Sequence, residues 1–327
     1  MKIDLGLPFA LAAIVIGYFL PSLLGGSSAI YSAFLLIAIF AVMSYGLDLI
    51  VSDMGEVSLA HPVFFAVGAY TTAILSVRHG VGPAGTLLAT IGVSLLFAVA
   101  MGLITLRLRE FVFSLVTYSV AVVALTVAQN WNFLGGSDGI TGLPAFEIGL
   151  FGFEFSAMTD RELWPVGFLL LLVTLYVVAA FRRSRLGHAA MTVHLNQKLA
   201  IMSGIDPQRT RMYVFLVSAP ITASAGWLYA YQRAYVSADV LSAYFLLLML
   251  TAVVLIGRRV LLAPLLGVTV ILFQEKFMSF GGYIDRIILG CALIVVLAFI
   301  PGGLIGAFRT LRQRLRRPSP KQALEAR

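Results

Sequence analysis

The chain has 327 residues, of which 60% are hydrophobic and 12% charged, and its mean hydropathy is +0.97. Repeated apolar runs of about 18 or more residues match the thickness of a bilayer core, so this composition excludes an ordinary soluble protein. It predicts an all-α, polytopic membrane protein. The net charge of +8 comes from basic residues near the ends of apolar runs, as membrane topology requires, which argues against a nucleic acid partner.

The hydropathy pattern predicts about eight to ten transmembrane segments, all within a single domain of residues 1–308. Three of the segments contain glycine or proline and can be broken or re-entrant helices. The residues responsible are Gly55, His61 with Pro62, Gly257 and Pro264. The predicted spans are 7–24, 29–51, 56–77, 84–106, 111–130, 163–181, 212–231, 240–257, 258–275 and 287–308. The first run also resembles a signal peptide, but its length favours a retained span.

Basic residues set the expected orientation. With both termini in the cytoplasm, nearly all lysines and arginines fall on the inner side, as the positive-inside rule requires. Those expected outside are Arg78, Arg161, Arg233, Lys276 and Arg286. The tail 309–327 is rich in arginine and contains Pro318 and Pro320, so we expect it to be disordered against anionic lipid headgroups. The predicted location is therefore the cell (inner) membrane.

Ionisable residues cluster where the second span leads into the third. Asp48, Asp53, Glu56 and His61 all lie near this inner junction, whereas the central spans are almost free of charge. Such groups can form a coupled-ion site. They can also be structural or gating residues, and Asp53 can cap the next helix. The histidines of the chain have no metal-ligand spacing, so no metal site is predicted.

The external stretch 131–162 contains a turn-rich element that can cap an external mouth or form a simple loop. Its residues are Gly136, Ser137, Asp138 and Gly139, directly after Gly135. The external side as a whole carries more acidic than basic residues. This surface can receive a substrate-binding protein, or it can be an ordinary solvated rim.

The internal loop 182–211 is too long for a simple turn. Written as one helix over 186–201, it has two apolar stripes, which need two surfaces. One stripe contains Leu186, Ala190, Val193, Ala200 and Ile201, and the other contains Met191, Leu195, Leu199 and Met202. The first can pack on this protein, and the second on a partner protein or on lipid. Gly204, Asp206 and Pro207 predict a helix end followed by a new helix start.

No phosphate-binding G-x-x-x-x-G-K-[ST] loop occurs in the chain, so energy must come from a partner or from an ion gradient. The spans contain no convergent set of nucleophile, base or metal ligands. We therefore predict no catalytic residues and no enzyme activity. A transporter remains, driven either by a partner ATPase or by an ion gradient.

Three separated motifs resemble one family. Residues 184–206 read SRLGHAAMTVHLNQKLAIMSGID, which is similar to the cytoplasmic loop of permease subunits of branched-chain amino acid ABC transporters. Residues 55–61, followed by Phe64, Phe65, Gly68 and Tyr70, resemble the family's G-x-x-S-L-G-H, F-F and G-A-Y signature. Residues 134–144 resemble the external T-G-G-S-D-G-L and G-I-P element of the LivM-type half. The order and number of matches make the resemblance specific, and it covers nearly the whole chain.

The resemblance implies a permease subunit of an ATP-driven importer that works by alternating access. Its expected partners are a second homologous permease, two cytoplasmic ABC ATPases that use ATP and Mg, an external substrate-binding protein and membrane lipid. No cofactor is expected on this chain. The ATPase-coupling loop would use Ser184, Gly187, Ala189, Ala190, Val193, Asn196, Gly204 and Ile205. The translocation path or its gate would use Glu56, Ser58, His61, Phe64, Phe65, Gly68 and Tyr70.

The chain also departs from the family pattern. His188 and His194 stand where arginines are common, and Leu195 stands where a glutamate is common, so partner contacts are expected to be specific to this chain. The stretch 256–267 lacks most of the glycines found there in the family. The substrates implied are branched-chain or other amino acids, or similar small polar solutes. An ion-gradient-driven secondary transporter is the alternative.

Overall fold

The computed structural model describes residues 6–105, 110–150 and 153–277, together with isolated positions between 284 and 294. Its α-helices are α1 Gly6–Leu23, α2 Ser28–Asp48, α3 His61–His79, α4 Pro83–Thr105, α5 Glu110–Asn130, α6 Asp160–Arg183, α7 Arg185–Leu195, α8 Gln197–Met202, α9 Pro207–Arg233, α10 Ala243–Ile256 and α11 Ala263–Phe277. The predicted helical architecture is confirmed. The predicted span 287–308 and the tail 309–327 lie outside the continuously described residues.

Short non-helical elements complete the fold. A π-helical turn, Leu49–Met54, continues α2, and 3₁₀ turns cover Asn132–Leu134 and Ala238–Leu241. Strand β1 (Ile140–Thr141) pairs with β4 (Tyr235–Val236), and β2 (Phe146–Leu150) pairs with β3 (Phe153–Ala157), both antiparallel. The external stretch 131–162 thus contains short strands that the sequence analysis did not predict.

Five helices of the described chain are long and apolar enough to cross a membrane. They cover Ser28–Met54, Pro83–Leu103, Phe111–Asn130, Asp160–Arg183 and Pro207–Arg233. Helix α10 has 14 residues, so it is shorter than the roughly 20 residues that a full crossing needs. Gly257 lies directly after its last residue, as the predicted break at this position requires, and α11 is described over 15 residues. The third span is also shorter than predicted, because α3 begins at His61.

Local sequence explains where the helices begin. Thr159 and Glu162 form a capping box at the start of α6, with Glu162 accepting from the Thr159 amide at 3.0 Å. Asp206 caps α9, and Pro207 occupies its first position, as predicted. Gly55 ends the π-helical turn in the left-handed conformation, with φ of 73°, which favours glycine.

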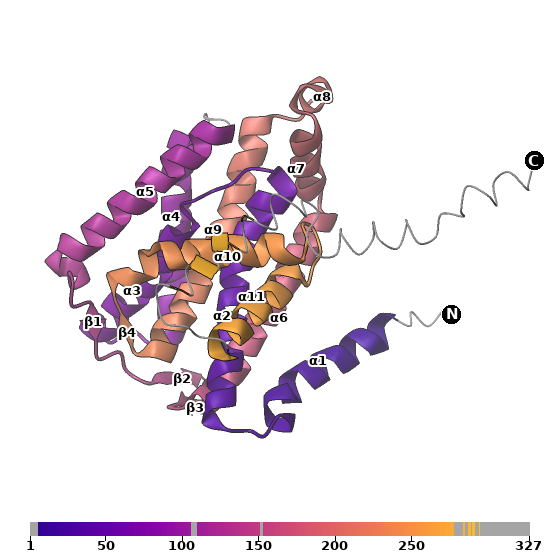
Figure 1. The fold of residues 1–327 in the computed structure, drawn as a ribbon. Helices are drawn as coiled ribbons and strands as arrows, with labels where there is room; N and C mark the ends of the chain where they lie inside the picture. Colours follow the sequence, from indigo (N-terminus) through magenta and orange to yellow (C-terminus); the bar gives the residue numbers. More distant parts are fainter. Residues whose placement is uncertain are drawn as a thin grey trace, which may run out of the picture.

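Helices α2, α3 and α9 form the centre of the protein, and α4, α6, α10 and α11 pack around them (Figure 1). The α3–α9 crossing is close because of small residues: a Cβ on Gly68 would collide with the Ala223 carbonyl, and one on Gly226 with the Phe65 carbonyl. Helix α5 lies at the periphery with most of its surface exposed. In Figure 1 the helices α7 and α8 lie at one end of the molecule and the strands at the other.

Candidate functional site

The residues predicted for the translocation path are all buried. Glu56, Ser58, His61, Phe64, Phe65, Gly68 and Tyr70 lie along α3 and the turn that precedes it. Because α3 runs through the centre of the bundle, these residues follow one axis from the α7 end toward the strand end. The structure therefore brings the predicted residues into line, but in a closed arrangement.

At the α7 end of this axis, buried carboxylates are paired with arginines. Arg182 contacts Asp48 at 2.6 Å and Asp53 at 3.0 Å, and Arg259 contacts Asp53 at 3.1 Å. Asp53 therefore does not cap the next helix: Ala60 occupies the cap position of α3 without a side-chain bond. The ion pairs join α2, its π-helical turn, α6 and the α10–α11 connection.

A separate ion pair fixes the turn before α3. Glu56 and Arg211 are 2.7 Å apart, and both side chains are largely buried. Since Asp48, Asp53 and Glu56 all have arginine partners, a fixed structural or gating role explains them better than a coupled-ion site.

The middle of the axis is aromatic. The His61 ring packs edge-on against Phe64 and Phe215, with centroids 5.6 and 5.9 Å apart. Among the described residues, no group of three His, Cys, Asp or Glu side chains is placed to hold a metal ion. The centre of the site thus consists of packed rings rather than of metal ligands.

Toward the strand end, Phe65 joins a cluster of rings beneath a cavity. Phe65 lies 5.2 Å from Tyr229 and 5.5 Å from Phe245, measured between centroids. The cavity has a volume of about 230 Å³ and is lined by Tyr229, Arg233, Tyr235, Ser237, Asp239, Val240 and Phe245. Sequence reasoning missed this pocket; it assigned Arg233 only to the external side.

The predicted external mouth supports one wall of that cavity. The Tyr235 hydroxyl donates to the Asp138 carbonyl at 3.1 Å, next to the β1–β4 pair. Gly139 has a φ of 71°, and a Cβ there would lie 2.5 Å from the Val236 carbonyl oxygen. Gly136 is also left-handed, and the Ser137 hydroxyl lies 3.5 Å from the Gln129 carbonyl. These residues hold β4 in place and do not line the cavity.

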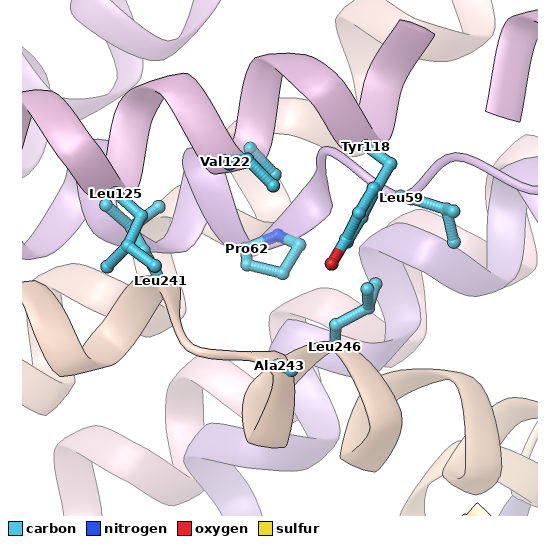
Figure 2. Close-up of a pocket in the computed structure, with 9 residues that line it drawn as sticks. Leu59, Pro62, Tyr118, Val122, Leu125, Leu241, Ala243 and Leu246 are labelled. Atoms are coloured by element: carbon cyan, nitrogen blue, oxygen red, sulfur yellow. The ribbon is translucent and has the colours of Figure 1, made fainter. Parts of the chain in front are cut away.

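A second, smaller pocket lies between α3, α5 and α10. Its volume is about 100 Å³, and its walls are apolar except for the Tyr118 hydroxyl, which Figure 2 shows directed toward Pro62 and Leu246. Its lining residues are Leu59, Pro62, Tyr118, Ala121, Val122, Leu125, Leu241, Ala243 and Leu246. No charged group faces this pocket, so it offers no partner for an ionic solute.

The internal loop folds into two helices rather than one. Ser184 caps α7 by accepting from the Gly187 amide at 3.2 Å, and Asn196 caps α8 by accepting from the Leu199 amide at 3.1 Å. The predicted continuous helix over 186–201 is therefore wrong, because Asn196 ends α7 in an extended conformation. The predicted stop is present: Gly204 has a φ of 78°, and the Ile205 amide donates to the Ala200 carbonyl at 2.9 Å.

Most of the first apolar stripe packs on the protein. Ala190, Val193 and Ala200 are buried and Leu186 is half-buried, whereas Ile201 is exposed, contrary to its predicted place. Beside the stripe, Gly187 is buried and Ala189 is half-buried. Helix α7 packs against α6, α9 and the π-helical turn. A Cβ on Gly55 would collide with the His194 ring, so the end of α7 lies directly on the turn before α3.

The second stripe has no cover from the described chain. Leu195, Leu199 and Met202 are 71%, 55% and 84% exposed. Exposed large apolar side chains grouped at one end of a protein mark a surface for a partner or for lipid. Met191 belongs to this stripe by sequence but is half-buried.

These features together define a polytopic membrane transport permease: a helical bundle with a closed axis and an internal loop docked on its end. The chain matches the family model described as "Branched-chain amino acid transport system / permease component" over residues 29–310, and it belongs to this family.

Two curated relatives support this assignment. The high-affinity branched-chain amino acid transport system permease protein LivM of Salmonella typhimurium (strain LT2) is 27% identical over 290 residues, which cover 82% of this chain and 68% of the relative. The protein of the same name from Escherichia coli (strain K12) is 27% identical over 296 residues, with the same coverage. No solved structure matches the chain.

Proposed function

We propose that the chain is a permease subunit of an ATP-driven ABC importer for branched-chain or other amino acids, or similar small polar solutes. It moves its substrate by alternating access, with both termini in the cytoplasm. A second homologous permease completes the pore, two ABC ATPases hydrolyse ATP with Mg on the cytoplasmic side, and an external binding protein delivers the substrate. Family membership and the LivM relatives support this assignment.

The observation that carries the proposal is the two-sided internal loop. One side of α7 and α8 is buried on the permease, while Leu195, Leu199 and Met202 project outward. A helix pair that served only to connect α6 and α9 would not need an uncovered apolar stripe. An ATPase surface that receives this stripe would move α7 and α8 as a unit.

The contacts of α7 also give this movement a route to the translocation axis. His194 lies on Gly55, and the next residue, Glu56, is paired with Arg211. A displacement of α7 therefore acts first on the turn before α3 and on the buried ion pairs beside it. Opening of the α7 end of the axis would follow from separating these pairs.

Charged substitutions on the exposed stripe test the proposal. Leu195→Glu and Leu199→Glu should abolish co-purification of ATPase subunits and ATP-dependent uptake in proteoliposomes, because each buries a carboxylate in an apolar interface. Folding should be unaffected, since both positions are exposed. Gln208→Glu is the matched control, because it adds the same charge at an exposed position of the loop outside the stripe.

A third variant tests how α7 packs on the permease itself. Gly187→Arg should detach α7 from the permease, because any side chain there meets the Phe181 carbonyl. ATPase subunits can then remain bound while ATP hydrolysis no longer drives uptake. Retained ATP-dependent uptake in all three variants would contradict the coupling role, and uptake driven by an ion gradient without ATP would establish the secondary transporter instead.

A further inference from the structure

The cavity above Phe65 contains a positive and a negative side chain that are not paired with each other. Arg233 and Asp239 both line it, yet they do not lie within ion-pair distance. The Arg233 guanidinium lies 5.6 Å from the centroid of the Tyr229 ring, and the Asp239 carboxylate accepts from the Ser237 hydroxyl at 3.2 Å. Neither charge forms an ion pair with another described residue. A cavity lined by two opposite charges that are not paired with each other can take a ligand that bears both charges.

Tyr70 supplies an independent observation. Its side chain is only 6% exposed, and its hydroxyl has no hydrogen-bond partner among the described residues. Two residues that line the cavity, Tyr235 and Asp239, are close enough to act electrostatically on this hydroxyl. Because buried polar groups are nearly always hydrogen-bonded, a buried hydroxyl without a partner needs an explanation. A ligand in the cavity would provide the missing partner.

The rest of the wall is apolar and aromatic. Tyr229 and Phe245 face the cavity, and both rings pack on Phe65 and on Phe40 behind it. A volume of about 230 Å³ is below the roughly 300 to 1,000 Å³ of pockets for drug-sized ligands. The cavity therefore suits a small solute with two opposite charges and an apolar part.

We propose that this cavity binds the zwitterionic end of an amino acid with an apolar side chain. The Arg233 guanidinium binds the carboxylate, and the Asp239 carboxylate, with Tyr70 beside it, binds the ammonium group. The aromatic wall takes the side chain. This assignment rests on the proposed function. In the orientation proposed there, the cavity faces outside and would receive the substrate before the axis along α3 opens.

The test measures equilibrium binding to the full chain in lipid nanodiscs, with the subunits that co-purify and without an external binding protein. The ligand is tritiated L-leucine. The competitors are 4-methylpentanoate, which lacks the ammonium group, and 3-methylbutylamine, which lacks the carboxylate. Each competitor lacks one charge-assisted contact, so its affinity should be roughly tenfold or more below that of leucine.

Two variants test which side chain binds which charged group of the ligand. Arg233→Gln should lower the affinity for leucine roughly tenfold. The affinity for 3-methylbutylamine should stay nearly unchanged, because this amine has no carboxylate for Arg233 to bind. Asp239→Asn should lower the affinity for leucine but not for 4-methylpentanoate, which has no ammonium group for Asp239 to bind. The matched controls are Arg161→Gln, an external arginine placed 5.7 Å over the Tyr31 ring, and Glu147→Gln on the external hairpin. Both controls should keep the wild-type order of the three ligands.

Several results would overturn the site. They are the absence of saturable leucine binding to the wild-type chain, an equal loss of all three ligands in a variant, and variants that match their controls. ATP-dependent leucine uptake by the reconstituted transporter, measured in parallel, separates the two proposals. Uptake without the charge-specific pattern rejects only the binding site, and the pattern without ATP dependence rejects only the importer.

Discussion

The two ends of the α3 axis differ in how their charges are paired. Near α7, Asp48, Asp53 and Glu56 are buried and each contacts an arginine. Near the strands, Arg233 and Asp239 are exposed to a cavity and unpaired within the described chain. The first end is closed by its own contacts, whereas the second has charged side chains that line a cavity. If the proposed function and orientation hold, this difference corresponds to a permease whose outer side can receive a ligand.

The energetics of the two ends differ for the same reason. A buried ion pair loses hydration, and it is most costly when one partner is removed and the other charge stays buried. A charge at an exposed pocket keeps its water until a ligand replaces it, so its removal costs little stability. Substitutions near α7 should therefore change folding, and those near the strands should change binding.

The largest effect is expected at Arg182, which bridges two carboxylates. Arg182→Met leaves Asp48 unpaired and Asp53 with Arg259 alone, so the free energy of unfolding should fall by about 3 to 5 kcal/mol. Equilibrium unfolding in detergent–lipid micelles measures this change. Arg183→Met is the control, because Arg183 is exposed and has no ion pair in the described chain.

Adding Asp48→Asn to Arg182→Met should recover part of the loss, since it removes the charge that Arg182→Met leaves unpaired. Equal stability of the Arg182 and Arg183 variants would mean that the α7 end is not locked by these ion pairs. The contrast between the two ends would then be lost.

The core between the two ends should respond next. Gly226→Val places a branched side chain against the Phe65 carbonyl and should cost about 1 to 3 kcal/mol of unfolding free energy, because the helices cannot separate without disturbing both ends. Gly92→Val is the control, since a Cβ there meets no atom within 4 Å. The unfolding midpoints of the two variants measure the difference. A similar loss in both would attribute the effect to helix propensity rather than to the α3–α9 crossing.

Much of the helical framework could be predicted from the sequence. Long apolar runs predicted α2, α4, α5, α6 and α9, because hydropathy and length are local properties. The break before α3 was also visible, since Gly55 and Pro62 are strong local signals. Apolar periodicity did not show the break inside the internal loop, because Asn196 interrupts the helix through a side-chain cap without disturbing the period.

The candidate site was only partly predictable. Glu56, Phe65 and Tyr70 came from a motif in one segment, and the structure places them along one axis. Their partners come from distant segments: Arg182 is 129 residues from Asp53, and the cavity is lined by the end of α9, the segment after it and α10. The packing of distant helices decides those contacts, and no local pattern in a single sequence reports such packing.

The smallest expected effect is at Tyr235, where the comparison can be sharpened without disturbing the fold. Tyr235→Phe removes the hydrogen bond to the Asp138 carbonyl, and the global unfolding free energy should fall by less than about 1 kcal/mol because the bond is exposed. Leucine affinity should still fall roughly two- to fivefold, because the bond holds β4 against the external loop. Faster amide exchange at Gly139 would report that loosening, and Tyr176→Phe, an exposed tyrosine of α6, serves as the control. If Tyr235→Phe instead reduced stability as much as Arg182→Met, the strand end would be part of the structural lock and not a separate receptive region.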